Sequence, residues 1–303
     1  MVLDEIEVAS NAILSSGLVA FPTETVYGLG ANAFDASAVK KIFLAKGRPS
    51  DNPLIVHVHS KEQVMDFVKE IPETAEKLIN EFWPGPLTFV LNSNGKIPSE
   101  VTAGLKTVAV RMPKNKIALE LIKCADVPIV APSANLSGKP SPTIAEHVIE
   151  DLNGKIDVII DGGSVNIGLE STVIDLTKKI PVILRPGKIS KKQIEKVIGE
   201  VKEHKKIDID KPLSPGMKYR HYAPKAKVVV IKDDNEIKYY SKKFPYLKIK
   251  YLKYGSSSKM AKNLFKDFRL TDKLRYDLIL VKEIDDDDFS SAVMDRLRKA
   301  SEE

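Results

Sequence analysis

Short β-rich runs follow one another closely through the first 200 residues, and their spacing limits the folds that this chain can adopt. Eight runs predict strands: LVAF (18–21), LIVHV (54–58), LTFVL (87–91), TVAVRM (107–112), PIVAPS (128–133), DVIID (157–161), STVIDLT (171–177) and PVILRPG (181–187). Several neighbouring runs leave no room for a helix between them. We therefore expect an α+β fold with a twisted mixed sheet, not a doubly wound parallel one.

Amphipathic stretches between these runs predict helices at 4–16, 36–46, 61–81, 115–124, 143–152 and 190–199. Further along, KVVVIK, YLKIKYL and YDLILVK predict strands, with helices at 234–243, 257–268 and 289–300. This βαβαβα order is typical of a small α/β, Rossmann-like domain with a parallel sheet. The polar, proline-containing stretch 201–225 is typical of a linker, so we expect domains at 1–200 and 226–303.

Composition narrows the class of protein. The 43% apolar and 29% charged shares are those of a globular protein in water, and no run of 18 apolar residues predicts a membrane span. MVLDEIEVAS is acidic where a secretion signal is basic, so we expect a cytoplasmic protein. Cys124 is the single cysteine, which excludes an internal disulfide, and we expect it to be buried. The net charge of +6 permits a phosphate-bearing partner without requiring one.

The stretch APSANLSGKPSPT (131–143) is a loop rich in hydrogen-bond donors and stiffened by prolines. Such a loop presents hydroxyl, amide and lysine groups at a low cost in conformational entropy. AFPTETVYGLG (20–30) likewise brings hydroxyls and a carboxylate to the end of a strand, where binding sites are common. The alternative for 20–30 is a structural turn whose glycines adopt positive φ.

Lys46 and Arg48 flank Gly47 at the end of a predicted helix. Two cations at this position could simply stabilise the helix dipole. Because Gly47 and Pro49 turn the chain into a loop, both cationic groups can instead converge on a polyanion.

Seven blocks carry a family resemblance: FPTETVYGLG, KGRPSDNPL, WPGPLT, VAVRMP, APSANLSGKPSPT, ESTVIDL and LRPG. In this order they closely resemble the threonylcarbamoyl-adenylate synthase, or YrdC-like, family. SPGMKYRHYAPKA and the residues after it resemble the two-domain form of that enzyme. The resemblance implies a YrdC-like fold with a positively charged concave face. It also implies a nucleotidyltransferase that condenses L-threonine, bicarbonate and ATP, with magnesium carried by ATP, into threonylcarbamoyl-AMP and pyrophosphate.

The same resemblance implies partners and a distribution of roles in the site. A downstream, KEOPS-like transferase complex would pass the threonylcarbamoyl group to tRNA, and weak tRNA contact or double-stranded RNA binding would accompany this. The central polar group would be Lys46, Arg48, Ser133 and Asn135. Threonine would be bound by Thr25, His57, Arg111, the Ala131 backbone and Ser171. ATP would contact Arg48, Asn52, Thr107, Ser133, Ser141, Arg185 and, from the linker, Tyr222.

Three further expectations complete the sequence analysis. The linker should fold over the site as a lid that excludes water. The acidic run 285–288 departs from the family pattern and is typical of a solvated helix start, while Trp83 should pack in the core. Two other functions remain as alternatives: an RNA-binding module without turnover, and a related carbamoylation step in metalloenzyme maturation.

Overall fold

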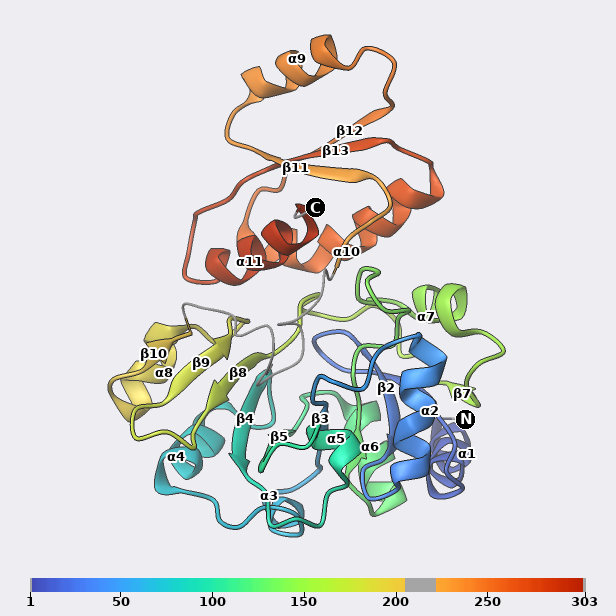
Figure 1. Ribbon diagram of the computed structural model, residues 1–303, viewed down its shortest axis with the longest axis vertical. Helices are drawn as coiled ribbons and strands as arrows, with labels where there is room; N and C mark the ends of the chain where they lie inside the picture. The colour runs from blue at the N-terminus through green and yellow to red at the C-terminus, as the bar shows by residue number, and fades with distance from the viewer. Residues whose placement is uncertain (1, 205–221, 302–303) are drawn as a thin grey trace.

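The computed structural model describes residues 2–204 and 222–301, which form a large and a small sheet (Figure 1). The large sheet has the order β10-β9-β8-β4-β5-β3-β6-β2-β1-β7. Its central strand β4 pairs antiparallel with β5 and parallel with β8, which confirms the predicted mixed sheet. The strands are β1 (Val19–Pro22), β2 (Tyr27–Asn32), β3 (Ile55–His57), β4 (Leu87–Asn92), β5 (Thr107–Arg111), β6 (Ile129–Val130), β7 (Val158–Ile159), β8 (Thr172–Asp175), β9 (Val182–Arg185) and β10 (Lys202–Glu203).

Helices pack on both faces of this sheet. They are α1 (Val2–Leu14), α2 (Ala36–Lys46), α3 (Lys61–Val64), α4 (Glu73–Phe82), α5 (Ser99–Thr102), α6 (Lys116–Ala125), α7 (Ala145–Leu152) and α8 (Lys191–Ile198). Helices α1 and α6 form an apolar cluster with Val19, Phe21 and Ile129 on the side opposite to the main core. Alternate strand residues such as Val56, Phe89 and Val110 enter the main core under the other helices. Their neighbours point to the opposite face, where Ile55 and Ala109 belong to a separate, small apolar cluster.

The small sheet has the order β11-β13-β12, with every pair parallel, as predicted. Its elements are β11 (Lys227–Ile231), α9 (Asp234–Lys243), β12 (Ile249–Leu252), α10 (Ser257–Lys273), β13 (Leu278–Lys282) and α11 (Ser290–Ser301). Figure 1 shows α10 and α11 between the small sheet and the large one, with α9 on the far side. Leu169, which precedes β8, is buried in the core that α10 and α11 form. One segment of the first sheet's domain therefore completes the core of the second.

The predicted helix 61–81 is two helices, α3 and α4, because the sequence Ile71-Pro72 interrupts it. Proline disfavours helical geometry at the residue before it and has no N–H of its own. The intervening chain pairs with the end of β4 instead, where the Lys69 N–H donates to the Asn92 carbonyl. The short α5 and β10 were not predicted, and α10 continues to Lys273, five residues past its predicted end.

Strand β2 was also missed, and its glycines serve close packing. Neither Gly28 nor Gly30 has a positive φ, so the alternative of a glycine turn is wrong. A Cβ on Gly30 would lie 2.8 Å from both Ile129 Cγ2 and Phe21 Cε1, which is too close for any side chain. Glycine here lets β2 lie against the side chains of its neighbours.

Smaller predictions have mixed outcomes. Trp83 is partly buried in the main core, with its ring 4.9 Å from that of Phe89, as expected. Cys124 is exposed on α6, which contradicts the predicted burial. The exposed acidic run lies just before α11, which begins at Ser290, and Asp287 accepts hydrogen bonds from the Ser290 N–H and the Ser257 hydroxyl. None of the described helices combines the length and apolar character that crossing a bilayer requires. Most of the predicted linker and lid, residues 205–221, lies outside the described residues.

Candidate active site

The face of the large sheet opposite to the main core carries a pocket that encloses about 690 Å³ of space, part of it open to solvent. Strand ends, the loop 131–143 and the residues before β8 and β11 form its wall. The lining residues are Thr23, Thr25, Val26, Gly28, Arg48, Ile55, His57, Arg111, Ala131, Pro132, Ser133, Asn135, Lys139, Ser141, Glu170, Ser171, Arg185 and Tyr222.

Strand alternation explains why polar side chains gather on this face. Val56 of β3 and Val110 of β5 point into the main core, so the next residue of each strand, His57 and Arg111, points the other way. These two residues stand opposite each other in the parallel pair of β3 and β5. A single register thus places an imidazole beside a guanidinium at the floor of the pocket.

Arg111 is buried and already has an anionic partner. Its Nη2 lies 2.7 Å from Glu24 Oε1, while Nη1 donates to Thr25 Oγ1 at 3.0 Å. The contact with Glu24 is an ion pair without hydrogen-bond alignment, because neither carboxylate oxygen of Glu24 has a donor among the described residues. A ligand can therefore still hydrogen-bond both ends of this pair.

His57 is neutral at physiological pH. Burial, helped by the positive charge of Arg111, lowers its pKa to about 3. Its Nδ1 is buried and has no hydrogen-bond partner among the described residues. Because buried polar atoms are normally satisfied, this atom marks a position where a ligand is expected to bind.

The loop 131–143 is held to β2 through its backbone. The Leu29 and Tyr27 N–H groups donate to the carbonyls of Pro132 and Pro142, and the Ala134 N–H donates back to Tyr27. The Asn135 side-chain amide donates to the Lys139 carbonyl at 2.9 Å. The rigidity that the prolines predict thus has a second source, in hydrogen bonds that fix both ends of the loop.

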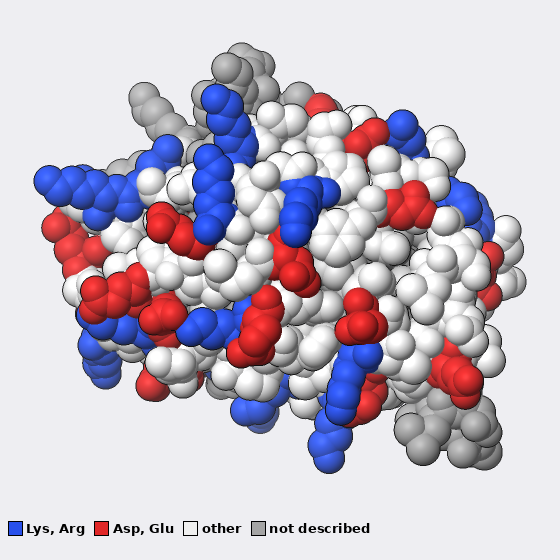
Figure 2. Space-filling model, turned by 90° about the horizontal axis from the view of Figure 1, so that it is seen from below, with Lys and Arg blue, Asp and Glu red and all other residues white. Residues whose placement is uncertain are grey.

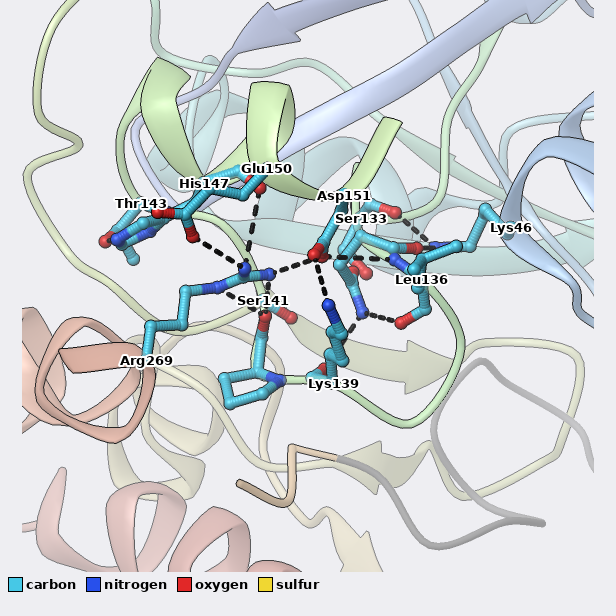
Figure 3. Close-up of polar contacts among 12 residues, drawn as sticks. Lys46, Ser133, Leu136, Lys139, Ser141, Thr143, His147, Glu150, Asp151 and Arg269 are labelled. Carbon is cyan, nitrogen blue, oxygen red and sulfur yellow. Dashed lines mark hydrogen bonds and ion pairs between the residues drawn. The ribbon is translucent and has the colours of Figure 1, made fainter. Parts of the chain in front are cut away.

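Lys46 binds this loop from behind and does not line the pocket. Its ammonium donates to the backbone carbonyls of Ser133 and Asn135, and the residue is only 3% exposed (Figure 3). Burial and the nearby Arg48 charge lower the pKa of Lys46 well below its usual value. The structure therefore places Lys46 where it supports the loop, while Arg48, Ser133 and Asn135 face the cavity.

Asn52 lies behind Arg48 in the same way. The Arg48 Nη2 donates to the Asn52 carbonyl at 3.2 Å. Asn52 is fully buried, and both polar atoms of its side chain find no hydrogen-bond partner among the described residues. The carbonyl contact orients the guanidinium, and the unsatisfied amide is a further sign of a polar ligand or water nearby.

A second group of polar contacts lies near the start of β8. Arg185 donates from Nε to the Ser171 carbonyl and from Nη2 to the Ser171 hydroxyl, both at 3.1 Å. The Ser171 hydroxyl also lies 2.8 Å from that of Thr88. Burial lowers the pKa of Arg185, yet the group remains a cation.

The small domain also reaches the loop. Arg269 of α10 donates to the Pro140 carbonyl at 2.6 Å and to Asp151 at 2.7 Å (Figure 3). Asp151 in turn accepts from the Lys139 ammonium at 2.8 Å and from the Leu136 N–H at 3.3 Å. The loop is thus held between α7, which carries Asp151, and a helix of the other domain.

Most of the residues expected at the site come together in this one pocket. Thr107 does not: it begins β5, four residues before Arg111, and strand geometry separates the two by about 13 Å. Lys46 and Asn52 are adjacent to the pocket without lining it. The expected residues that do line it are Thr25, Arg48, His57, Arg111, Ala131, Ser133, Asn135, Ser141, Ser171, Arg185 and Tyr222.

Two charged lining residues, Lys139 and Glu170, were not among the expected site residues, while Glu24, the carboxylate of the stretch 20–30, pairs with the lining residue Arg111. Each lies inside a block that carried the family resemblance, so the signal was present. The sequence did not show that the carboxylates of Glu24 and Glu170 pair with arginines far away in the chain, Arg111 and Arg296. Among the described residues, no cluster of three or more His, Cys, Asp or Glu side chains could hold a metal ion.

Comparisons with known proteins agree with this architecture. Residues 11–187 match the Sua5/YciO/YrdC family model, described as telomere recombination, and residues 189–302 match the C-terminal domain of threonylcarbamoyl-AMP synthase. The chain belongs to this family, in its two-domain form.

Full-length relatives make the match more specific. The threonylcarbamoyl-AMP synthase of Pyrococcus abyssi is 51% identical over 98% of this chain and 94% of its own length. That of Bacillus subtilis is 45% identical over 98% of this chain and 93% of its own length. The crystal structure of P. abyssi Sua5 complexed with L-threonine superposes with a TM-score of 0.93, at 51% identity, and covers 98% of this chain and 94% of that one.

Proposed function

We propose that this protein is a threonylcarbamoyl-AMP synthase, which condenses L-threonine, bicarbonate and ATP and releases pyrophosphate. The full-length likeness to enzymes of that name supports the assignment. The observation that carries it is the convergence of Arg48, Ser133 and Asn135 with Arg111 and Ser171 around one cavity. A set of phosphate-binding groups and a set of groups suited to an amino acid thus share one pocket.

The amino acid would occupy the floor of the pocket. Arg111 is the cation for the carboxylate, since a guanidinium binds a carboxylate through two parallel hydrogen bonds. The neutral His57, Thr25, Ser171 and the Ala131 backbone would bind the remaining polar groups of threonine. The P. abyssi Sua5 structure is a complex with L-threonine, which supports threonine as the amino acid.

The nucleotide would lie along the loop 131–143. Arg48 and Arg185 would offset phosphate charge, while Ser133 would donate to a phosphoryl oxygen as the carbamate attacks the α-phosphorus. Asn135 already donates both of its amide N–H groups, to the Leu136 and Lys139 carbonyls, so it would fix the shape of the loop beside the phosphates. Ser141 and Tyr222 would contact the rest of the nucleotide. Because three reactants must meet, positioning supplies most of the acceleration, and effective molarities of about 10⁵ M or more are attainable. Lys46 and Asn52 would act from behind, by orienting the loop and Arg48.

Magnesium would enter with ATP, bound to its phosphate oxygens, and screen their charge. Glu170, in the pocket wall, and Glu24, which pairs with Arg111, each already have an arginine partner, which is consistent with an ion held by the substrate phosphates. The product would pass to a transferase that modifies tRNA in the cytoplasm. The domains would be 1–200 and 226–303, with the segment between them as a lid that keeps water from the carbamate and the mixed anhydride.

An RNA-binding module without turnover is not favoured. Such a module needs a broad surface of one charge sign, because phosphate neutralisation dominates its affinity. Figure 2 shows acidic and basic side chains interspersed over the lower face of the molecule. The buried, unpartnered polar atoms of His57, Asn52 and Asn135 lie at or beside an enclosed pocket, which suits small ligands.

The test is pyrophosphate release with MgATP and bicarbonate, with each of the twenty amino acids in turn. We expect turnover with threonine only, and a loss of at least about a hundredfold in Arg48→Ala, the size of effect seen when a transition-state donor is removed. Arg275→Ala, a change of the same kind at an exposed position in the small domain, should keep full activity. Release that needs no amino acid, or that Arg48→Ala leaves intact, contradicts the proposal.

A further inference from the structure

Helix α11 of the small domain places an arginine directly behind the pocket. The Arg296 side chain is fully buried, and its Nε donates to Glu170 Oε2 at 2.9 Å. Its Nη2 donates to the Pro186 carbonyl at 3.0 Å, and Nη1 lies 2.6 Å from Asp295 Oδ2. The guanidinium carbon is also 5.4 Å from the centre of the Tyr222 ring. One side chain of the second domain therefore touches two lining residues of the pocket, Glu170 and Tyr222.

Glu170 holds a hydroxyl of the pocket in one orientation. Its Oε1 lies 2.6 Å from Ser141 Oγ. Burial alone would raise the pKa of Glu170, but Arg296 and Arg185 hold it below its usual value, so the carboxylate is ionised. An ionised carboxylate can only accept hydrogen bonds, so the Ser141 proton is committed to Glu170. What Ser141 offers to a ligand is its lone pairs.

The segment immediately before Glu170 is fixed by the small domain. Leu169 is fully buried in the core of α10 and α11. Gly168, with φ of +87°, packs so closely on α10 that a Cβ would lie 2.3 Å from the Ala261 carbonyl oxygen. The position of Glu170 in the pocket thus depends on contacts that only the second domain supplies.

We propose that Arg296 is a positioning residue for the nucleotide: it neutralises Glu170 so that this carboxylate can lie in an anion-binding pocket and hold Ser141 as a hydrogen-bond acceptor. The group that Ser141 receives is then a donor of the nucleotide, a ribose hydroxyl or the adenine amino group, since phosphate oxygens only accept. The inference rests on the proposed function for the nucleotide site itself.

Because Arg296 compensates the charge of Glu170, changing one of these residues or both should affect ATP binding differently. In Arg296→Met the apolar stem is kept, but the buried Glu170 loses its hydrogen-bonded cation and only the charge of Arg185 remains nearby, while Asp295 keeps Lys299 as a partner. We expect the KM for ATP to rise by at least about tenfold, and by more than the KM for threonine, because a buried charge that has lost its partner is costly. Adding Glu170→Gln removes that charge while the amide oxygen can still accept from Ser141. The double variant should return to within about threefold of the KM of Glu170→Gln alone, since the two changes are coupled.

The experiment measures pyrophosphate release and, separately, ATP binding by calorimetry without threonine. Arg298→Ala, an exposed neighbour on α11, and Lys192→Ala, which breaks the interdomain ion pair with Asp288 at the surface, are controls that should match the wild type. If Arg296→Met folds poorly, the double variant, in which residue 170 is neutral and Asp295 keeps Lys299 as a partner, can still be compared with Glu170→Gln alone.

Two results would overturn the inference: an unchanged ATP affinity in Arg296→Met, or a loss that Glu170→Gln does not reverse, as expected of an arginine that only joins the domains. A wild-type protein without threonine-dependent turnover would instead contradict the proposed function, and calorimetry would still test Arg296.

Discussion

Burial divides the basic side chains around the pocket into two roles. Lys46 donates to two loop carbonyls and is sealed from solvent, whereas Arg48, two residues later, lines the cavity. The left-handed Gly47 between them turns the chain so that the two groups approach the loop and the cavity separately. Two cations close together in a sequence can therefore have different roles, one in supporting a loop and the other in binding a ligand.

His57 should make the free energy of unfolding depend on pH. Its pKa is about 3 in the folded protein against 6.5 in an exposed histidine, so between these values only the unfolded state is protonated. Stability is therefore complete above pH 6.5 and falls as the pH drops towards 3. Between pH 7 and pH 5 this residue alone should account for about 2 kcal/mol.

The measurement is urea unfolding of the ligand-free protein at both pH values. His57→Gln should lose less stability on acidification than the wild type, by that amount. Equal losses in the two proteins would mean that His57 is protonated without hindrance in the fold.

The sequence identified the polar residues of the site better than it identified their partners. Residues such as Arg111 and Ser133 lie within short motifs, where spacing and residue type are visible. The ion pair between Arg296 and Glu170 joins positions 126 residues apart, and no local pattern specifies it. Lys46 was expected in the site because the sequence does not show on which side of the turn at Gly47 its side chain lies.

At the scale of elements, β2 shows how side-chain size sets the distance between the strands and the loop. Tyr27 and Leu29 point into the main core, while Gly28 and Gly30 face the side chains of β1 and β6. The isolated bridge between Gly28 and Ser133 joins this strand to the loop that lines the pocket. The absence of a side chain at these two positions thus lets the loop approach the sheet.

Gly30→Ala should destabilise the fold by about 1–3 kcal/mol, the usual cost of adding a methyl group to a packed interior. The new Cβ would lie 2.8 Å from Ile129 and Phe21. Chemical denaturation monitored by circular dichroism gives the value. The control is Gly255→Ala, where the nearest atom to the new Cβ, Lys259 Nζ, is 3.9 Å away. A change in Gly30→Ala no larger than in the control would show that β1 and β6 yield to the extra atom.

Element prediction succeeded where caps and periodicity agree and failed where tertiary contacts decide. Helix α2 begins after Asp35 and ends before Gly47, both visible signals, and its bounds match the prediction. The helix predicted at 61–81 fails because apolar periodicity was followed across Pro72. Strand β2 was missed since its alternating glycines resemble a turn until their packing partners are known.

On the scale of the whole molecule, the two domains share both a core and a site. Leu169 completes the small domain's core, and Arg269 and Arg296 bond residues that support or line the pocket. Buried ion pairs contribute modestly to net stability but are expensive to break, because one charge is left without compensation. The domains should therefore unfold together.

Arg269→Leu tests this coupling. Asp151 would keep its contact with the half-exposed Lys139 but lose its buried partner, so we expect a loss of about 3 kcal/mol in the free energy of unfolding. Trp83, the single tryptophan, reports on the large domain by fluorescence, and tyrosine signals in near-ultraviolet circular dichroism report on both domains. In the wild type the two transitions should coincide.

Lys192→Ala, which removes an exposed interdomain pair, should change stability by less than about 1 kcal/mol. An Arg269→Leu protein as stable as this control would show that the buried contact is replaceable by water, and that the domains are held by apolar packing alone.

The outermost strands of the large sheet, β7 and β10, pair with their neighbours over two residues each. A long, flat outer strand would present a row of unsatisfied amide groups to other copies of the chain. The two edge strands are too short for another copy of the chain to pair along them, and Lys202 and Glu203 place opposite charges on β10. In the described part of the chain, both edges of the large sheet therefore offer little backbone for pairing with another copy, which disfavours edge-to-edge aggregation.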